Sequence, residues 1–205
     1  MKYFAYGSNM LTTRLTDRVP SASFVSLATV SGRKLVFHKR SGDKSGKCDI
    51  PACDDSSSAV HGVLFEISDS EWDDLDKHEG VGCGYERTDI DVMIGSQNIG
   101  AKTYLATTSH IENGLIPYDW YYCLVVAGAR EQKLPEDYIK SIASVPCKDD
   151  PNPSRKTRLE ALDALKAAGT PYSPTCRTSG CYQQTTRHES KTCGQMSVEQ
   201  DGAPK

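Results

Sequence analysis

The sequence predicts an α+β fold in which a small β-sheet curls or closes on itself and is followed by helices and a polar tail. About six segments with strand character fill residues 3–107, and few helices separate the early ones, as is typical of a curled or barrel-like sheet. Residues 118–169 instead show helical periodicity. Residues 172–205 are rich in Ser, Thr, Gln and Gly, so we expect disorder there. The predicted parts are a domain over 1–150, a C-terminal helix over 151–170 and a tail over 171–205.

The opening stretch combines a strand, a turn and a helix start. Residues 3–6 are aromatic and strand-like, Gly7 and Ser8 interrupt the strand, and Asn9 can cap a helix over 10–16. Such a junction leaves several backbone N–H groups unpaired in one place. These groups suit an anion or a developing oxyanion, although the pattern also fits an ordinary turn after a first strand.

The next segments alternate strands with polar connections. Residues 24–31 and 34–38 are predicted strands, and residues 39–58 form a long polar loop, with or without a short strand over 47–51. The remaining predicted strands, with apolar residues on alternate positions, are 60–67, 85–94 and 99–107.

Helix signals begin after residue 67. Ser68 and Glu71 form a capping box, Ile67 and Trp72 occupy the positions of a hydrophobic staple, and Gly80 ends the helix. Three further helices are predicted over 118–132, 135–145 and 153–169.

Composition limits the class of protein. A length of 205 residues favours one domain, and a net charge of −3 gives no support for a nucleic-acid partner. No apolar run approaches the roughly 18 to 20 residues that cross a bilayer, and the N-terminus is a poor signal peptide. We therefore expect a cytoplasmic protein whose eight cysteines are mostly free thiols. Nothing in the sequence indicates an oligomeric state.

Glu79 is the most informative charged residue. It lies four residues after Leu75 and seven after Trp72, so it falls on the apolar stripe of its helix. A carboxylate on a buried face needs a partner or a chemical task, and a partly buried glutamate can serve as a general base. The alternative is a frayed helix end from which Glu79 turns to solvent.

Other candidate sites have weaker support. His78 and Cys83 could suggest a nucleophilic pair, but His78 would leave the helix face that Glu79 occupies. The segment 44–47 lacks the residue order of a phosphate-binding loop. Zinc-ligand types with loose spacing occur in the tail at Cys176, Cys181, His188 and Cys193.

Several motifs in order resemble the γ-glutamylcyclotransferase family. They are Tyr6-Gly7-Ser8-Asn9-Met10, Glu79-Gly80-Val81, Gly84-Tyr85, the 39–50 loop, Gly128-Ala129 and the run 134–138. The resemblance covers about residues 1–145 and leaves the tail unmatched. It implies a small mixed β-barrel with surrounding helices and a cavity at one end.

The resemblance also implies an activity of glutathione metabolism. The α-amine of a γ-glutamyl amide attacks its own γ-carbonyl, releasing 5-oxoproline and a free amine or amino acid. Glu79 would be the general acid/base, and no metal or cofactor would be needed. The substrate-binding residues implied are Tyr6, Gly7, Ser8, Asn9, Met10, Tyr85 and Tyr121. Tyr6 and Tyr85 could equally be packing residues, and for Tyr121 core packing is the favoured alternative.

Two other functions remain open at this point. The chain could bind a γ-glutamyl ligand without turning it over, or act as an interaction protein through a zinc-bearing tail. The identity of the leaving amine is not indicated by the sequence.

Overall fold

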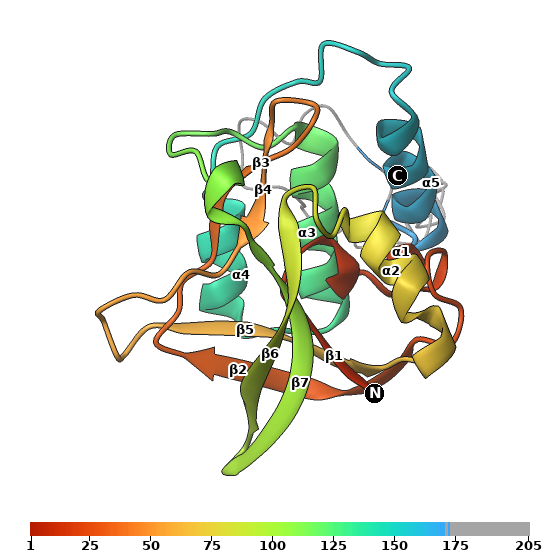
Figure 1. The fold of residues 1–205 in the computed structure, drawn as a ribbon. Helices are drawn as coiled ribbons and strands as arrows, with labels where there is room; N and C mark the ends of the chain where they lie inside the picture. Colours follow the sequence, from red (N-terminus) through yellow and green to blue (C-terminus); the bar gives the residue numbers. More distant parts are fainter. Residues whose placement is uncertain (171, 173–205) are drawn as a thin grey trace, which may run out of the picture.

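Five strands close into a barrel in the computed structural model, which describes residues 1–170 and 172 (Figure 1). β1 pairs antiparallel with β5 and parallel with β7, and the second pairing closes the barrel. The predicted small mixed barrel is therefore confirmed. In spatial order its strands are β1 (Lys2–Ala5), β5 (Ala59–Glu66), β2 (Ser23–Ser31), β6 (Tyr85–Ile94) and β7 (Gln97–Ala106).

The long hairpin of β6 and β7 follows the predicted alternation. The two strands pair in continuous antiparallel register, and Gly95 in the turn has a φ of +60°, a conformation that favours glycine. On β6, Ile90 and Val92 are buried while Asp89 and Asp91 are exposed. Alternation thus sends apolar side chains into the barrel and acidic ones outward.

A second, two-stranded sheet consists of β3 (Val36–Arg40) and β4 (Gly46–Asp49). Both strands are shifted by one or two residues from the predicted ones, and neither joins the barrel. A side chain at Gly46 would place a Cβ 2.2 Å from the Phe37 carbonyl oxygen, so this close pairing requires glycine. In Figure 1 the hairpin stands above the barrel, beside α3.

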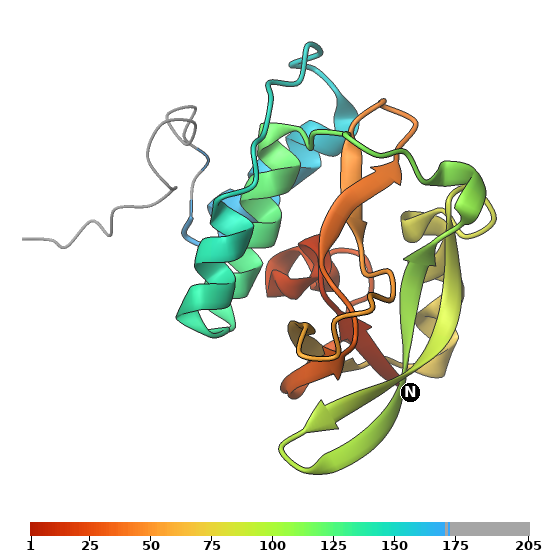
Figure 2. The same ribbon diagram turned by 90° about the vertical axis from the view of Figure 1, so that its left-hand side faces the viewer.

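Three helices, α3, α4 and α5, lie together on one side of the barrel, whereas α2 lies on another side (Figure 2). α3 is the central one, and all its residues from 119 to 129 are buried. Three short 3₁₀ turns complete the regular structure: η1 (Ser8–Met10), η2 (Asp69–Glu71) and η3 (Thr108–His110). The helices are α1 (Thr12–Thr16), α2 (Trp72–Glu79), α3 (Asp119–Glu131), α4 (Glu136–Ala143) and α5 (Lys156–Ala167).

Three predicted helix starts are wrong in detail. Asn9 lies inside η1 and α1 begins only at Thr12, so Asn9 is not a helix cap. Ser68 makes no capping bond, because the Glu71 carboxylate instead accepts hydrogen bonds from the backbone and hydroxyl of Ser21. α5 starts at Lys156, three residues late, because the preceding residues form a side-chain-bonded turn.

The predicted end of α2 is confirmed. The helix ends at Glu79, and Gly80 follows in the left-handed conformation with a φ of +71°. The predicted disorder of the tail and its zinc candidates fall on residues outside the described ones. No helix in the described chain has the length and apolar character that spanning a membrane requires.

Candidate active site

Glu79 lies at the C-terminal end of α2 with only 16% of its side chain exposed. Trp72 and Leu75, on the same stripe of the helix, are almost completely buried. The phase of the helix therefore directs the carboxylate into the protein, as predicted, and the frayed end does not occur.

One oxygen of this carboxylate is held by two donors. Asn9 Nδ2 donates to Glu79 Oε1 at 2.9 Å, and Arg18 Nη1 donates to the same oxygen at 2.6 Å. Arg18 also donates to Asn9 Oδ1 at 2.9 Å, which fixes the amide. Asn9 in turn donates to the hydroxyl of Tyr3 at 2.9 Å. These bonds lock the side chain of Glu79 in place, while no described residue bonds its second oxygen, Oε2.

A small cavity of about 30 Å³ adjoins Glu79, room for about one water molecule. Its walls come from the turn after β1, from β4, from the last residue of α2 and from tyrosines on β1, β6, β7 and α3. No lysine or arginine lines it. The lining residues are Tyr3, Tyr6, Gly7, Ser8, Asn9, Cys48, Glu79, Tyr85, Tyr104 and Tyr121.

The tyrosines shape this cavity through the backbone of neighbouring strands. Tyr85 donates to the Cys48 carbonyl at 2.5 Å, and Tyr121 accepts a bond from the Cys48 N–H at 3.1 Å. Tyr6 donates to the carbonyl of Tyr104. Burial raises the pKa of each of the hydroxyls of Tyr6, Tyr85 and Tyr121 well above its ordinary value, so they remain neutral donors.

Cys48 is not a suitable nucleophile despite its position in the wall. Burial raises the pKa of its thiol to about 12, and only 1% of the residue is exposed. A thiol is nucleophilic as thiolate, which is scarce at neutral pH when the pKa is this high. Glu79 is thus the one carboxylate and the one proton-accepting group that lines the cavity.

The turn after β1 lines the same cavity and contains unpaired backbone donors. Hydrogen bonding within the turn begins with the N–H of Met10, which donates to the Gly7 carbonyl at 3.0 Å. The N–H groups of Gly7, Ser8 and Asn9 have no partner among the described residues. Unpaired N–H groups at the start of a helical turn are available to a negatively charged oxygen.

The structure brings together seven of the eight residues that the sequence indicated. Met10 is the exception: it is completely buried and packs against α3, where Gly128 leaves it room. A side chain at Gly128 would put a Cβ 2.9 Å from the Met10 Cβ. Met10 therefore supports the turn from the core side and does not line the cavity. The seven are Tyr6, Gly7, Ser8, Asn9, Glu79, Tyr85 and Tyr121.

Arg18, which contacts both Glu79 and Asn9, is a residue of this candidate site that the sequence did not indicate. A single arginine just after a short helix is usually solvated, and no local pattern separates it from such residues. Tyr3 and Tyr104 were also missed, although alternation along their strands could have placed both on the inner face.

The rival sites gain no support from the described residues. His78 and Cys83 are exposed and no hydrogen bond joins them in the described part of the chain. Within residues 1–170 and 172, no group of three His, Cys, Asp or Glu side chains could hold a metal ion.

The closed barrel, the firmly held carboxylate and the tyrosine-lined cavity are together suited to proton transfer on a small bound molecule.

Residues 59–142 match the AIG2-like family. The chain is 34% identical to a bovine γ-glutamylcyclotransferase and 32% identical to the human one, covering 87% and 89% of their lengths and 80% and 82% of its own. A solved structure titled γ-glutamyl cyclotransferase superposes with a TM-score of 0.71 at 28% identity, over 82% of this chain and 98% of that one.

The chain belongs to the γ-glutamylcyclotransferase family. Similarity over about four fifths of the chain thus assigns it to the family that its loop and glutamate motifs resemble.

Proposed function

We propose that this protein is a γ-glutamylcyclotransferase, which converts a γ-glutamyl amide into 5-oxoproline and a free amine or amino acid. The α-amine of the substrate attacks its own γ-carbonyl carbon, the amide C–N bond breaks, and the departing nitrogen receives a proton. Two curated relatives with this name and the geometry around Glu79 support the proposal.

The proposal depends on the different surroundings of the two carboxylate oxygens of Glu79. Oε1 is held by Asn9 and Arg18, whereas Oε2 has no partner among the described residues. A substrate α-ammonium in the cavity can therefore donate its proton to Oε2 without disturbing the bonds that orient the carboxylate. The same oxygen can then return the proton to the leaving nitrogen.

The turn after β1 would stabilise the negative charge that develops in the reaction. As the amine attacks, negative charge develops on the γ-carbonyl oxygen, and the free N–H groups of Gly7, Ser8 and Asn9 are the donors placed to stabilise it. Gly7 keeps this surface open, because a Cβ there would lie 3.2 Å from the Cys48 Cβ and 3.4 Å from the Tyr121 oxygen.

The chemistry needs neither metal nor cofactor. Nucleophile and electrophile belong to one molecule, so the protein has to fold the substrate into a ring-closing pose, and proximity then supplies much of the acceleration. Buried tyrosines whose hydroxyls are fixed by hydrogen bonds to backbone groups can hold the reacting atoms of the substrate in such a pose.

The proposed setting is the cytoplasm, in glutathione metabolism, with small γ-glutamyl molecules as partners. Cys48, Cys53, Cys83 and Cys123 are free thiols in the described part of the chain, as is usual in a reducing compartment. The net charge of −3 gives no basis for a nucleic-acid partner.

The test is incubation of the full chain with γ-glutamyl compounds, with 5-oxoproline detected by mass spectrometry. Wild-type protein should release 5-oxoproline, and Glu79→Gln should bind the same compound, measured by calorimetry, without releasing it. Asp73→Asn, an exposed change on the same helix, is the matched control and should remain active. Binding by wild-type protein with no 5-oxoproline from any compound would show a binding protein and overturn the proposal.

A further inference from the structure

A second, larger cavity of about 250 Å³ continues outward from the first. The two share Ser8, Glu79, Tyr85 and Tyr121, so they meet at the carboxylate that is proposed to transfer the proton. The inner cavity has room only for the reacting atoms of a γ-glutamyl substrate, so the rest of the molecule, its leaving group included, must lie in this outer one.

The outer cavity contains more positive than negative charge. Arg18 is paired with Glu79 at 2.6 Å, and Lys47 is paired with Asp43 at 3.0 Å. Two cations remain, Arg14 and Lys39, and neither makes an ion pair with any described residue. They are the unbalanced charges of this cavity.

Both unpaired cations are buried. Arg14 is 6% exposed, and its Nε is buried without a hydrogen-bond partner. Burial, then the neighbouring Arg18, lowers the pKa of the Arg14 guanidinium to about 9. A buried guanidinium whose Nε has no hydrogen-bond partner and that makes no ion pair is unfavourable, and an anion that enters the cavity reduces that penalty.

Lys39 is held over the same space by close packing. The residue is 7% exposed, its Nζ lies 4.6 Å from the centre of the Tyr85 ring, and a Cβ at position 84 would lie 2.9 Å from that Nζ. Burial lowers the pKa of Lys39, while Glu79 and Asp43 oppose the shift. The ring contact fixes the amine at the junction of the two cavities, since Tyr85 lines both.

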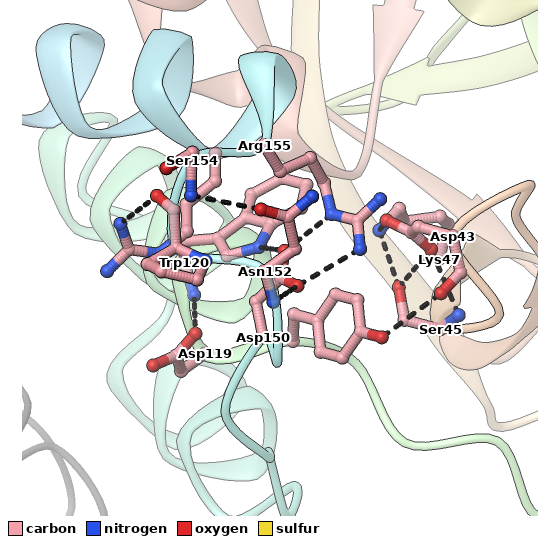
Figure 3. A network of polar contacts seen from close by, with 12 residues as sticks. Asp43, Ser45, Lys47, Asp119, Trp120, Asp150, Asn152, Ser154 and Arg155 are labelled. Carbon is pink, nitrogen blue, oxygen red and sulfur yellow. Dashed lines mark hydrogen bonds and ion pairs between the residues drawn. The ribbon is translucent and has the colours of Figure 1, made fainter.

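A network of hydrogen bonds and ion pairs adjoins the outer cavity at Asp43, Lys47 and Trp120 (Figure 3). Lys47 lies 4.5 Å from the centre of the Trp120 ring, and the Trp120 indole donates to Asp150 at 3.0 Å. Arg155 holds that carboxylate through two bonds of 2.6 and 3.1 Å. Lys47 is thus occupied by the Asp43 carboxylate and the Trp120 ring. The positive charges that remain without an ion-pair partner among the described residues are those of Arg14 and Lys39.

We infer that the outer cavity is a subsite for an acidic leaving group, so that the preferred substrates are γ-glutamyl derivatives of aspartate or glutamate, with Arg14 and Lys39 binding the two carboxylates. This inference rests on the proposed cyclotransferase function. Every γ-glutamyl substrate carries the α-carboxylate of its glutamyl residue. To this the leaving group adds no carboxylate if it is a simple amine, one if it is a neutral amino acid and two if it is an acidic amino acid. The inner cavity has no cation of its own that would compete for them.

The experiment compares γ-glutamyl-glutamate with γ-glutamyl-glutamine. The first has a charged side-chain carboxylate where the second has a neutral amide of the same shape. The kcat/KM of the wild-type protein for the glutamate compound should exceed that for the glutamine compound by about tenfold, the worth of one charge-assisted hydrogen bond. A γ-glutamyl alkylamide should be the poorest substrate of the three.

Variants then assign the preference to its residues. Lys39→Met keeps the length of the side chain and removes its charge, and it should bring the glutamate-to-glutamine ratio close to one. Lys77→Met, which removes an equal charge from the exposed face of α2, should leave the ratio unchanged. Because both substrates are measured on the same preparation, the ratio does not depend on how much of a variant is folded. Arg14→Gln provides a second, independent reduction of the ratio.

The outcomes separate this inference from the proposed function. If no γ-glutamyl compound yields 5-oxoproline, the cyclotransferase proposal itself has failed. If all three compounds are cyclised but wild-type protein shows no preference for the glutamate compound, the acidic subsite is disproved and the enzyme stands. A preference that survives in both Lys39→Met and Arg14→Gln would also overturn the inference.

Discussion

Arg18 Nη1 lies 2.6 Å from Glu79 Oε1, and the two residues are 61 positions apart in the chain. Both side chains are largely buried, with exposures of 14% and 16%. The contact joins the segment after α1 to the end of α2, and it orients the carboxylate on which the proposed chemistry depends.

Removal of the Glu79 charge tests its role in proton transfer. Glu79→Gln preserves shape and the bond from Arg18 but cannot accept a proton, so we expect kcat to fall by about 10³-fold, within the range for a lost general base. Circular dichroism should show an unchanged fold. A variant with more than a tenth of wild-type kcat would contradict the assignment.

Replacement of Arg18 tests its role as a positioning residue. Arg18→Met leaves the Glu79 carboxylate partly buried with Asn9 as its remaining donor, and we expect a loss of about 2 kcal/mol in the free energy of unfolding. Because the carboxylate is no longer fixed, kcat should fall more than KM rises. Arg18→Lys should recover part of kcat, and equal activities of the two variants would argue against a positioning role.

Gly7→Ala tests the shape of the inner cavity. The added methyl group would lie 3.2 Å from the Cys48 Cβ and narrow the space beside Tyr121, so kcat/KM should fall by about tenfold. Gly42→Ala is the matched control, because its Cβ would meet no atom within 4 Å and its backbone is not in the left-handed region. Equal effects of the two substitutions would show that Gly7 matters only for chain flexibility.

Asp150 links α5 to the wall of the outer cavity, and its ionisation should appear in acid unfolding. Burial alone would raise its pKa, but bonds from Arg155, the Asn152 N–H and the Trp120 indole together hold the pKa below its ordinary value. As pH falls below about 3.9, the Asp150 carboxyl is protonated in the unfolded chain before it is protonated in the folded one. The contribution of Asp150 to the free energy of unfolding is therefore complete above that pH and is lost as pH falls further.

Asp150→Asn should accordingly lower the free energy of unfolding at neutral pH and make it change less with pH in the acid range. We expect a loss of about 3 kcal/mol by urea denaturation, because Arg155 loses a fully buried partner. Asp137→Asn breaks an exposed pair and should change stability by less than about 0.5 kcal/mol. A similar small change at Asp150 would show that the contact contributes little.

Thiol labelling should distinguish the cysteines by burial. Burial raises the pKa of both Cys48 and Cys123 to about 12, so neither should react with iodoacetamide at pH 8 in the folded protein. Cys83 is exposed and lines the outer cavity, so it should react, and more slowly when a γ-glutamyl compound is bound. Peptide mass spectrometry reads each site, and rapid labelling of Cys48 would contradict its placement in the core.

The positions of the main elements could be predicted from the sequence because they depend on local signals. Alternation marked the barrel strands, and Gly80 marked the end of α2. The spacing from Trp72 to Glu79 placed the carboxylate on the buried face, since helical phase is fixed over two turns whatever the rest of the chain does. Capping was less predictable: Glu71, a plausible capping partner by sequence, bonds Ser21 instead.

By itself, the sequence determined the strands, the inward direction of Glu79 and the loop of residues 6–9. The tertiary structure alone decided that Arg18 and Asn9 hold one carboxylate oxygen, that Met10 belongs to the core, and that Arg14 and Lys39 face a shared cavity without acidic partners. The reason is physical: local periodicity fixes which way a side chain points, but the group it meets there depends on how distant segments pack when the barrel closes and the helices cover it.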